Sequence, residues 1–186
     1  MFRDLGTVRL ETERLILRRF KETDAEAVFQ GFTGDAKCAE FCTWRVHPDS
    51  DYTKKILSFW IDEYEDGAYN WVAERKDTHE LIGNVNTASI SRSHRTCEIG
   101  YCFGSRFRGQ GYATEALQRV LSFLLDECGF HVIEGRHESS NPASGRVMEK
   151  AGMTCEAVLS ERRFDPENNV YHDIVVYSIK NQKSLP

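Results

Sequence analysis

Strand-like and helix-like segments alternate along this chain of 186 residues, and no internal repeat, low-complexity tract or linker interrupts them. Alternation of this kind predicts a layered α/β or α+β structure. A chain of this length can bury a core of ordinary size without disulfide or metal staples. We therefore expect residues 1–186 to form a single domain.

The first half of the chain predicts a strand, two helices and a meander. Arg14–Phe20 alternates as a strand, and the helix after it carries a capping box of Thr23 and Glu26. Ser50 is the expected cap of a second helix. The apolar stripe expected on that helix consists of Tyr52, Ile56, Phe59, Trp60 and Tyr64. Residues 69–103 read as three antiparallel strands separated by polar turns.

The second half adds two helices and three strands. A helix is expected from Gly111 to Cys128, stopped by Gly129, and a shorter one from Asn141 to Ala151. Strands are expected over 131–138, 153–164 and 169–179, the last two joined by a turn at 165–169. The fold class is thus α/β or α+β, with about seven strands.

Composition excludes several classes of function. The formal net charge is −5 and the pI is about 5.7, so general affinity for nucleic acid or for an anionic membrane is not expected. The charged N-terminal residues do not resemble a signal peptide, and no apolar run is long enough to span a bilayer. We expect a cytoplasmic protein.

The cysteines of a cytoplasmic protein are expected to remain thiols. There are six of them, and no two are spaced as a CxxC pair. A metal site could be drawn from Cys38 and Cys42 with His47, or from Cys128 with His131, but neither spacing matches a known zinc site. We expect no metal.

The segment FGSRFRGQGYATEAL, Phe103–Leu117, places glycines and arginines directly before a helix. Unpaired amides and the positive end of the dipole make a helix start a site for phosphate. Gly109 and Gly111 would let the backbone approach an anion closely, and Arg108 would add positive charge. A solvated loop, with glycines for turning and arginines for solubility, is the alternative.

Two phosphate-binding motifs are absent from this loop. A Walker A motif requires a lysine after the glycines, and none is present. A dinucleotide fingerprint requires a glycine or alanine at its third position, where this chain has Thr114.

The pattern Arg106-x-x-Gly109-x-Gly111-x-Ala113 resembles the acetyl-coenzyme A loop of the GNAT superfamily of N-acetyltransferases. Three further segments, LETERLILRRFKETDAEAVF, CEIGYCF and NPASGRVMEKAGM, look like the branch that contains the RimJ/RimL ribosomal-protein N-terminal acetyltransferases. The resemblance covers nearly the whole chain in the order of the family. It implies a GNAT fold, which is a mixed but mostly antiparallel, twisted sheet of about seven strands with helices on both faces. It also implies an N-acetyltransferase that uses acetyl-coenzyme A (acetyl-CoA).

The resemblance also implies which residues hold acetyl-CoA. The pyrophosphate would contact the backbone amides around Arg108, Gly109, Gly111, Tyr112 and Ala113, and the hydroxyl of Thr114. The pantetheine arm would pair with the backbone of Tyr101, Cys102 and Phe103, much as an added strand would. The helix that follows is expected to contribute Asn141, as both N-cap and ligand, and Ser144.

Direct transfer of the acetyl group to an amine would require three contributions. Glu98 is the candidate base, directly or through a water; a solvated strand residue or the partner of an arginine is the alternative. Backbone amides near Tyr101–Phe103 would polarise the carbonyl. Ser144 would donate to the leaving thiolate. The histidines at 94, 131, 137 and 172 are interpreted as structural.

The acceptor is expected to be a primary amine. Deprotonation at pH 7 costs about 1.4 kcal/mol for an α-amine and about 4.6 kcal/mol for lysine, so an α-amine needs the weaker base. A protein N-terminus is one candidate, and an amino acid, polyamine or antibiotic is the other. A coenzyme A-binding module without turnover is the alternative from another class. The chain could be a monomer or a homodimer.

Overall fold

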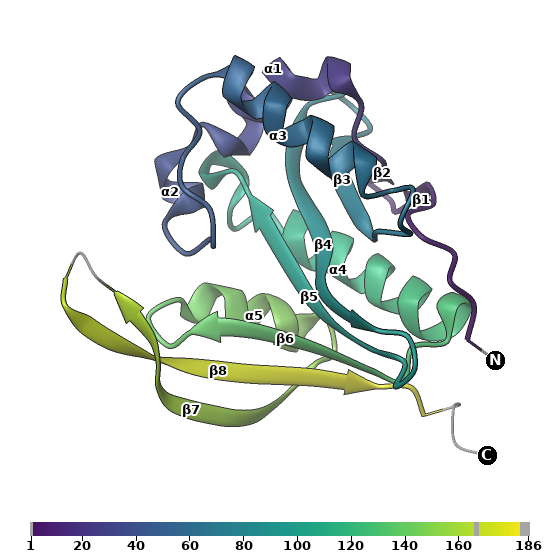
Figure 1. Ribbon diagram of the computed structural model, residues 1–186, viewed down its shortest axis with the longest axis vertical. Coiled ribbons are helices and arrows are strands. Elements are labelled where there is room, and N and C mark those ends of the chain that lie inside the picture. The colour runs from purple at the N-terminus through teal and green to yellow at the C-terminus, as the bar shows by residue number, and fades with distance from the viewer. Residues whose placement is uncertain (1, 166–167, 183–186) are drawn as a thin grey trace.

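The computed structural model describes residues 2–165 and 168–182. Within these residues, eight strands form one twisted sheet in the order β1-β2-β3-β4-β5-β6-β8-β7 (Figure 1). Their bounds are β1 Leu10–Glu11, β2 Leu15–Arg18, β3 Asn70–Arg75, β4 Leu81–Ser91, β5 Thr96–Phe103, β6 Val132–Glu138, β7 Thr154–Asp165 and β8 Val170–Lys180. Neighbouring strands are antiparallel except for β5 and β6. The mixed, mostly antiparallel sheet is confirmed.

The expected count of about seven strands is one too low. The additional strand is β1, which comprises two residues and pairs Leu10 with Leu17 and Glu11 with Ile16 of β2. A segment this short carries too little alternation to be recognised as a strand. Part of the expected turn at 165–169 lies outside the described residues.

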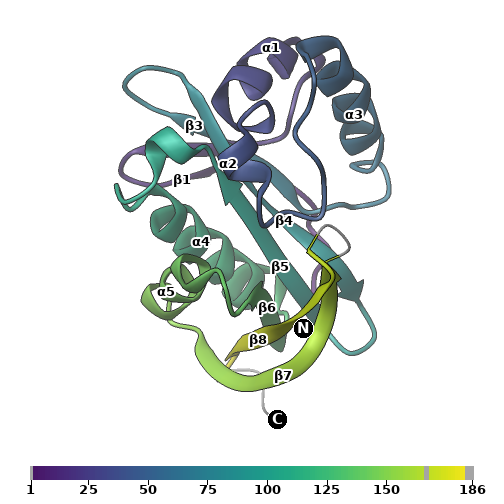
Figure 2. The same ribbon diagram turned by 90° about the vertical axis from the view of Figure 1, so that its left-hand side faces the viewer.

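Helices cover both faces of the sheet (Figure 2). One face carries α4 and α5, and the other carries α1 to α3. The bounds are α1 Ala25–Val28, α2 Ala36–Ala39, α3 Ser50–Asp62, α4 Tyr112–Ser122 and α5 Pro142–Lys150, with 3₁₀ turns at Glu22–Asp24 (η1) and Ser105–Phe107 (η3) and π-helical turns at Phe29–Thr33 (η2) and Phe123–Cys128 (η4). None of the helices described is long and apolar enough to cross a bilayer.

The first helical segment begins differently from the expected capping box of Thr23 and Glu26. Asp24 accepts the backbone amide of Lys21 at 2.8 Å, and its carboxylate pairs with the Arg18 guanidinium at 2.7 Å. The capping carboxylate therefore lies at Asp24, where the ion pair with Arg18 compensates its burial.

Helix α3 is capped by Asp49 rather than by Ser50, since the Asp49 carboxylate accepts the Tyr52 amide at 2.7 Å. The expected apolar stripe is also displaced. Phe59 is 65% exposed and Tyr52 is 44% exposed, whereas Thr53 and Leu57 are fully buried. The hydroxyl of Thr53 is held by the imidazole of His47 at 2.9 Å, so a polar residue occupies the inward face.

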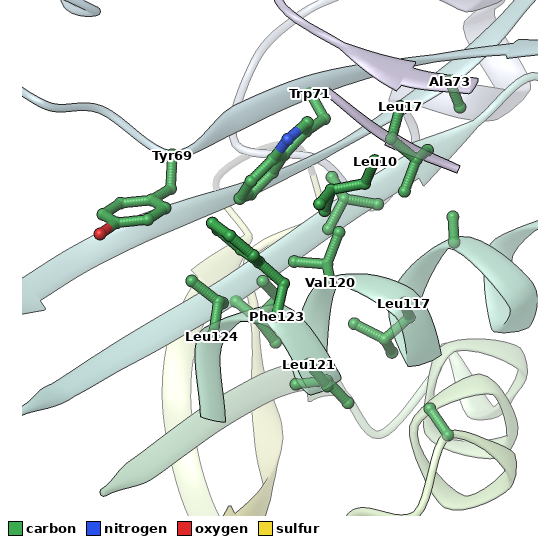
Figure 3. Packing of buried hydrophobic residues seen from close by; sticks show 14 of the residues in the cluster. Leu10, Leu17, Tyr69, Trp71, Ala73, Leu117, Val120, Leu121, Phe123 and Leu124 are labelled. Atoms are coloured by element: carbon green, nitrogen blue, oxygen red, sulfur yellow. The ribbon is translucent and has the colours of Figure 1, made fainter. Parts of the chain in front are cut away.

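The face under α4 contains the larger core (Figure 3). Trp71 and Phe123 are fully buried and meet edge to face, with ring centroids 5.9 Å apart. The sequence predicts a buried stripe on the long helix made of Ala113, Ala116, Leu117, Val120, Leu121, Leu124 and Cys128. All of these residues are buried except Ala113, which is partly buried against the same core. This core fixes α4, and with it the loop at the start of α4.

Two glycines bring backbone into direct contact on the opposite face. A Cβ atom on Gly31, in η2, would lie 1.9 Å from the carbonyl oxygen of Leu81 in β4. A Cβ atom on Gly104, directly after β5, would lie 2.1 Å from the carbonyl oxygen of Gly31. The first helical segment, β4 and the beginning of the loop at residues 104–111 are thus packed without intervening side chains.

Candidate active site

Strands β5 and β6 lie side by side at one end and diverge at the other (Figure 1). Their parallel pairing joins Thr96–Ile99 to Val132–Gly135 and does not continue beyond these residues. Residues 100–103 of β5 remain paired with β4 on the other side. The edge of β5 at Tyr101–Phe103 that faces β6 is therefore free to pair with an extended ligand.

The divergence opens a cavity of about 1340 Å³. Every residue expected from the sequence to bind the cofactor or to act in catalysis lines it: Glu98, Tyr101, Cys102, Phe103, Arg108, Gly109, Gly111, Tyr112, Ala113, Thr114, Asn141 and Ser144. The fold thus brings segments that are far apart in the sequence together around a single cavity.

The helix start has the backbone geometry that the glycines suggested. Gly109 and Gly111 have φ of +76° and +84°, in the left-handed region that favours glycine. Gly111 is the N-cap of α4, so the amides of Tyr112, Ala113 and Thr114 begin the helix without acceptors inside it. Since these residues line the cavity, the positive end of the helix dipole faces it.

Arg108, the residue expected to add positive charge to the loop, is hydrogen-bonded to another segment. The Arg108 guanidinium donates to the carbonyl oxygen of Lys37 at 2.6 Å. Arg14 lies closer to the helix start, because its guanidinium donates to the Gln110 carbonyl oxygen at 3.0 Å and sits 4.4 Å from the centre of the Tyr112 ring. Arg14 was not expected at the site, since it reads as the first residue of a strand.

Glu115 ties the helix start to the turn before β2. Its carboxylate accepts the Thr12 hydroxyl at 2.6 Å, the Arg14 amide at 2.8 Å and the Arg14 guanidinium at 2.6 Å. Burial acts to raise the pKa of Glu115, but these hydrogen bonds outweigh it and the pKa lies below its ordinary value. The carboxylate is therefore ionised at neutral pH and holds Arg14 beside the loop.

The expected N-cap of α5 is present. The Asn141 side-chain oxygen accepts the Ser144 amide at 3.4 Å, and Pro142 occupies the first turn. The hydroxyl of Ser144 lies 2.9 Å from the Tyr101 hydroxyl, which also donates to the Ser144 carbonyl oxygen at 2.8 Å. The phenol has a single proton, so the Ser144 hydroxyl donates to Tyr101 in this arrangement. Burial raises the pKa of Tyr101 to about 12, which keeps the phenol protonated.

Glu98 faces the side of the sheet covered by α1 to α3. Side chains alternate along β5, and Cys102 packs in the core of that side whereas Ile99 packs against α4. The Glu98 carboxylate lies 3.5 Å from Arg136 of β6, and Arg136 also contacts Glu134 at 3.1 Å. The side chain of Glu98 is 30% exposed. It is thus both the partner of an arginine and a residue of the cavity.

Comparison with known proteins decides the family. The acetyltransferase (GNAT) domain model matches residues 14–154. The chain belongs to the GNAT acetyltransferase family. The uncharacterized N-acetyltransferase YoaA of Bacillus subtilis is 33% identical over 170 residues, which cover 91% of this chain and 95% of YoaA. The protein is therefore an acetyl-CoA-dependent N-acetyltransferase.

Solved structures agree with the GNAT fold. The GNAT-family acetyltransferase of Bacillus anthracis superposes with a TM-score of 0.81 at 28% identity, covering 95% of this chain and all (100%) of that chain. RimL, a ribosomal L7/L12 alpha-N-protein acetyltransferase solved with coenzyme A, superposes with a TM-score of 0.82 at 20% identity, covering 93% and 98%.

Three asparagines that the sequence did not single out also line the GNAT cavity. Asn84 and Asn86 of β4 line it, and so does Asn70 of β3. The motif NVN, with its asparagines two apart in a strand, was the available signal, because both then point to one face. For the tryptophans at 44, 60 and 71, the sequence favours core packing over a pocket or a dimer contact. Trp71 belongs to the core, whereas Trp44 and Trp60 line the cavity. His137, interpreted as structural, also lines the cavity.

The metal alternatives are not assembled in this GNAT domain. Among residues 2–165 and 168–182, no group of three or more histidine, cysteine or acidic side chains comes together as metal ligands. His47 is engaged by Thr53, and Cys128 is buried in the core under α4.

Proposed function

We propose that this GNAT enzyme binds acetyl-CoA along the free edge of β5 and transfers the acetyl group directly to a primary amine entering from the side of α1 to α3. One observation carries the proposal, namely that the divergence of β5 and β6 and the start of α4 open into the same cavity. A free strand edge fits the amides of pantetheine. A helix start with two left-handed glycines fits a pyrophosphate.

The residues assigned to the cofactor follow from this placement. The pyrophosphate would accept hydrogen bonds from the Thr114 hydroxyl and from the backbone amides around Arg108, Gly109, Gly111, Tyr112 and Ala113. Arg14 would be held nearby by Glu115. The backbone of Tyr101–Phe103 would pair with the pantetheine arm. Asn141 and Ser144 would meet its thioester end. The thioester supplies the activated acetyl group.

Three groups would then share the chemistry. Glu98 would receive the proton of the amine, directly or through a water. The amides near Tyr101–Phe103 would stabilise negative charge on the carbonyl oxygen. Ser144 would turn its proton from Tyr101 toward the departing sulfur. A thiol of this kind has an ordinary pKa near ~8.5, so the hydroxyl need provide only modest help.

Ser144→Ala is expected to lower kcat by about a hundredfold, the lower end of the range for general acid catalysis, because the leaving thiolate is weakly basic. The affinity for acetyl-CoA should change little, since the Ser144 amide still reaches Asn141. Steady-state kinetics and calorimetry check the two expectations. Ser140→Ala, which alters a neighbouring serine outside the cavity lining, is the control. A wild-type kcat would show that water, not Ser144, protonates the thiolate.

An α-amine, as at a protein N-terminus, is the acceptor that we favour. The Glu98 carboxylate is partly exposed to solvent and forms an ion pair with Arg136. Such a group suits the cost of about 1.4 kcal/mol for deprotonating an α-amine better than the cost of about 4.6 kcal/mol for lysine. RimL, which has the same fold, acts on a protein α-amine by its description. The asparagines of β3 and β4 provide neutral hydrogen-bonding groups that suit a peptide backbone.

Glu98→Gln is expected to flatten the acid limb of the pH–rate profile, because the amide cannot accept the proton of the amine. Glu134→Gln is the matched control, since Glu134 also contacts Arg136 but does not line the cavity. The profile of kcat/KM against pH checks both variants. An acid limb unaltered in Glu98→Gln, or altered equally in both, would reject Glu98 as the base.

A screen of acceptors tests the proposed function as a whole. Release of free thiol from acetyl-CoA is measured with three sets of acceptors. The first set is peptides with a free N-terminus, and the second is N-terminally blocked peptides that carry a lysine. The third set is amino acids, polyamines and aminoglycosides. We expect turnover with free N-termini and none with the blocked peptides. Turnover confined to small amines would favour the small-molecule alternative. Saturable cofactor binding with no product from any acceptor would favour a binding module.

A further inference from the structure

Two cations on α5 line the cavity without a partner. Arg146 and Lys150 are exposed, and both line the cavity. Among residues 2–165 and 168–182, no ion pair or hydrogen bond engages the side chain of either one. The other arginines of the lining are each engaged, namely Arg14 by Glu115, Arg108 by the Lys37 carbonyl oxygen and Arg136 by Glu98 and Glu134. Arg146 and Lys150 are thus the cations of the lining that are available to an anion.

The two side chains share one face of α5. They are four residues apart, and residues at this spacing are neighbours on a helix surface. Like charges at this spacing repel each other, and the only carboxylate of α5, that of Glu149, accepts the Tyr177 hydroxyl at 2.9 Å. The helix dipole favours a cation at Lys150, in the last turn, but not at Arg146, in the middle of the helix. An anion bound between the two cations would offset their repulsion.

Arg146 and Lys150 lie close to the start of α4. Helices α4 and α5 are side by side in both views (Figure 1, Figure 2), and the Gln118 side chain of α4 donates to the Lys150 carbonyl oxygen at 2.9 Å. Gln118 is about one helical turn beyond Thr114, and both residues line the cavity. Val147, partly buried against the core under α4, adds an apolar surface to the lining. The cavity therefore continues from the helix start into the space between α4 and α5.

We propose that Arg146 and Lys150 bind the 3′-phosphate of acetyl-CoA. The inference rests on the proposed function, which places the pyrophosphate at the start of α4 and the pantetheine arm along β5. The adenosine carries the 3′-phosphate and is attached to the opposite end of the pyrophosphate. It would therefore extend away from the sheet, between α4 and α5, where the two exposed cations stand.

The charge of the 3′-phosphate suits a pair of cations. A phosphate monoester carries a charge of about −1.5 to −2 at pH 7, whereas each phosphate of the pyrophosphate carries a single charge. Arginine can donate two parallel hydrogen bonds to a phosphate, and lysine adds a compact positive charge. The amides at the start of α4 would serve the pyrophosphate. The two phosphate groups of the cosubstrate would thus have separate partners.

The test compares acetyl-CoA with acetyl-3′-dephospho-CoA, which lacks only this phosphate. Calorimetric titration of the full chain gives Kd for each ligand, and the ratio of the two constants is the measured quantity. We expect the wild type to bind acetyl-CoA about tenfold to a hundredfold more tightly, the range for a hydrogen bond to a charged group. A wild type that binds the two ligands equally would overturn the proposal.

A double variant tests the assignment to these two residues. The protein with both Arg146→Ala and Lys150→Ala should bind the two ligands equally, because the phosphate then lacks both partners. A change in folding affects the Kd of both ligands alike, so it cancels in the ratio. A double variant that keeps the wild-type ratio would overturn the proposal.

Three further variants serve as controls. Arg146→Lys and Lys150→Arg keep the positive charge, so each should retain most of the preference for acetyl-CoA. Arg162→Ala removes an exposed arginine of β7 that lies outside the cavity lining, and it should keep the wild-type ratio. A ratio lowered as far by Arg162→Ala as by the double variant would show that the preference comes from overall charge rather than from a site.

The outcome can be separated from that of the proposed function. Gly111→Asp alters the proposed pyrophosphate site and is titrated with the same two ligands. If only the present inference is wrong, Gly111→Asp weakens the binding of both ligands and the double variant keeps the wild-type ratio. An unchanged Kd in Gly111→Asp would instead refute the proposed pyrophosphate site, whereas the ratio in the double variant still reports on Arg146 and Lys150.

Discussion

Gly111→Asp is expected to weaken acetyl-CoA binding by about a hundredfold to a thousandfold. The new carboxylate would stand at the N-cap of α4, where the pyrophosphate is proposed to bind. Two like charges about 4 Å apart near a protein surface repel by about 4 kcal/mol, and each 1.4 kcal/mol changes Kd tenfold. A Cβ atom at this position would lie 3.3 Å from the Arg14 guanidinium. The aspartate would therefore also pair with Arg14, the cation beside the proposed pyrophosphate site.

The variant Gly111→Ala distinguishes the effect of the added negative charge on acetyl-CoA binding from the effect of backbone strain. Both variants place a side chain at φ +84°, which costs about 1–2 kcal/mol of stability. That strain is present with or without the cofactor, so alanine should lower the Tm while changing Kd by less than about tenfold. Calorimetric titration with acetyl-CoA and thermal unfolding are measured on both proteins. Equal losses of affinity in the two variants would show that the loop does not face an anion.

Gly31→Ala is expected to destabilise the protein by about 3 kcal/mol, at the upper end for overpacked sites. The added methyl group would lie 1.9 Å from the Leu81 carbonyl oxygen and 3.0 Å from its carbon. These are backbone atoms of β4, so no side chain can rotate to make room. For a chain of this size, such a loss lowers Tm by about 6–12 °C.

The effect of Gly31→Ala should extend to the active site. The Gly31 carbonyl oxygen lies against Gly104, where the loop that leads to α4 begins. We therefore expect weaker acetyl-CoA binding in the folded variant below its Tm. Gln30→Ala, an exposed neighbour in the same turn, should change stability by less than about 0.5 kcal/mol. A Tm unchanged by Gly31→Ala would mean that η2 does not pack directly on β4.

The sequence predicted the elements of this fold where a local signal was strong. The amphipathic stripe from Ala116 to Cys128 and the caps Asn141 and Gly129 depend on residues near one another in the chain, and each is present as expected. The face of α3 was assigned wrongly because its inward positions include the polar Thr53, held by His47. Aromatic residues such as Phe59 remain exposed, and hydrophobicity alone does not reveal that.

The cavity lining was largely accessible from the sequence, but the interactions within it were not. The loop glycines and the residues around NPAS were found from motifs that are continuous in the chain. The pairing of Glu115 with Arg14, the contact of Arg108 with Lys37 and the hydrogen bond from Cys102 to Asn84 join segments distant in sequence. Such contacts depend on strand order and register, which no local pattern encodes. The catalytic roles of Glu98 and Ser144 remain predictions.

The parallel arrangement of β5 and β6 has an electrostatic consequence. Helix α4 follows the carboxyl end of β5, and α5 follows the carboxyl end of β6. Parallel strands end on the same side, so both helices begin at the open end of the divergence. Two helix dipoles therefore direct their positive ends toward one mouth, and residues of both helix starts line it. An acidic protein can in this way attract a polyanionic cosubstrate at one place while its surface as a whole repels anions.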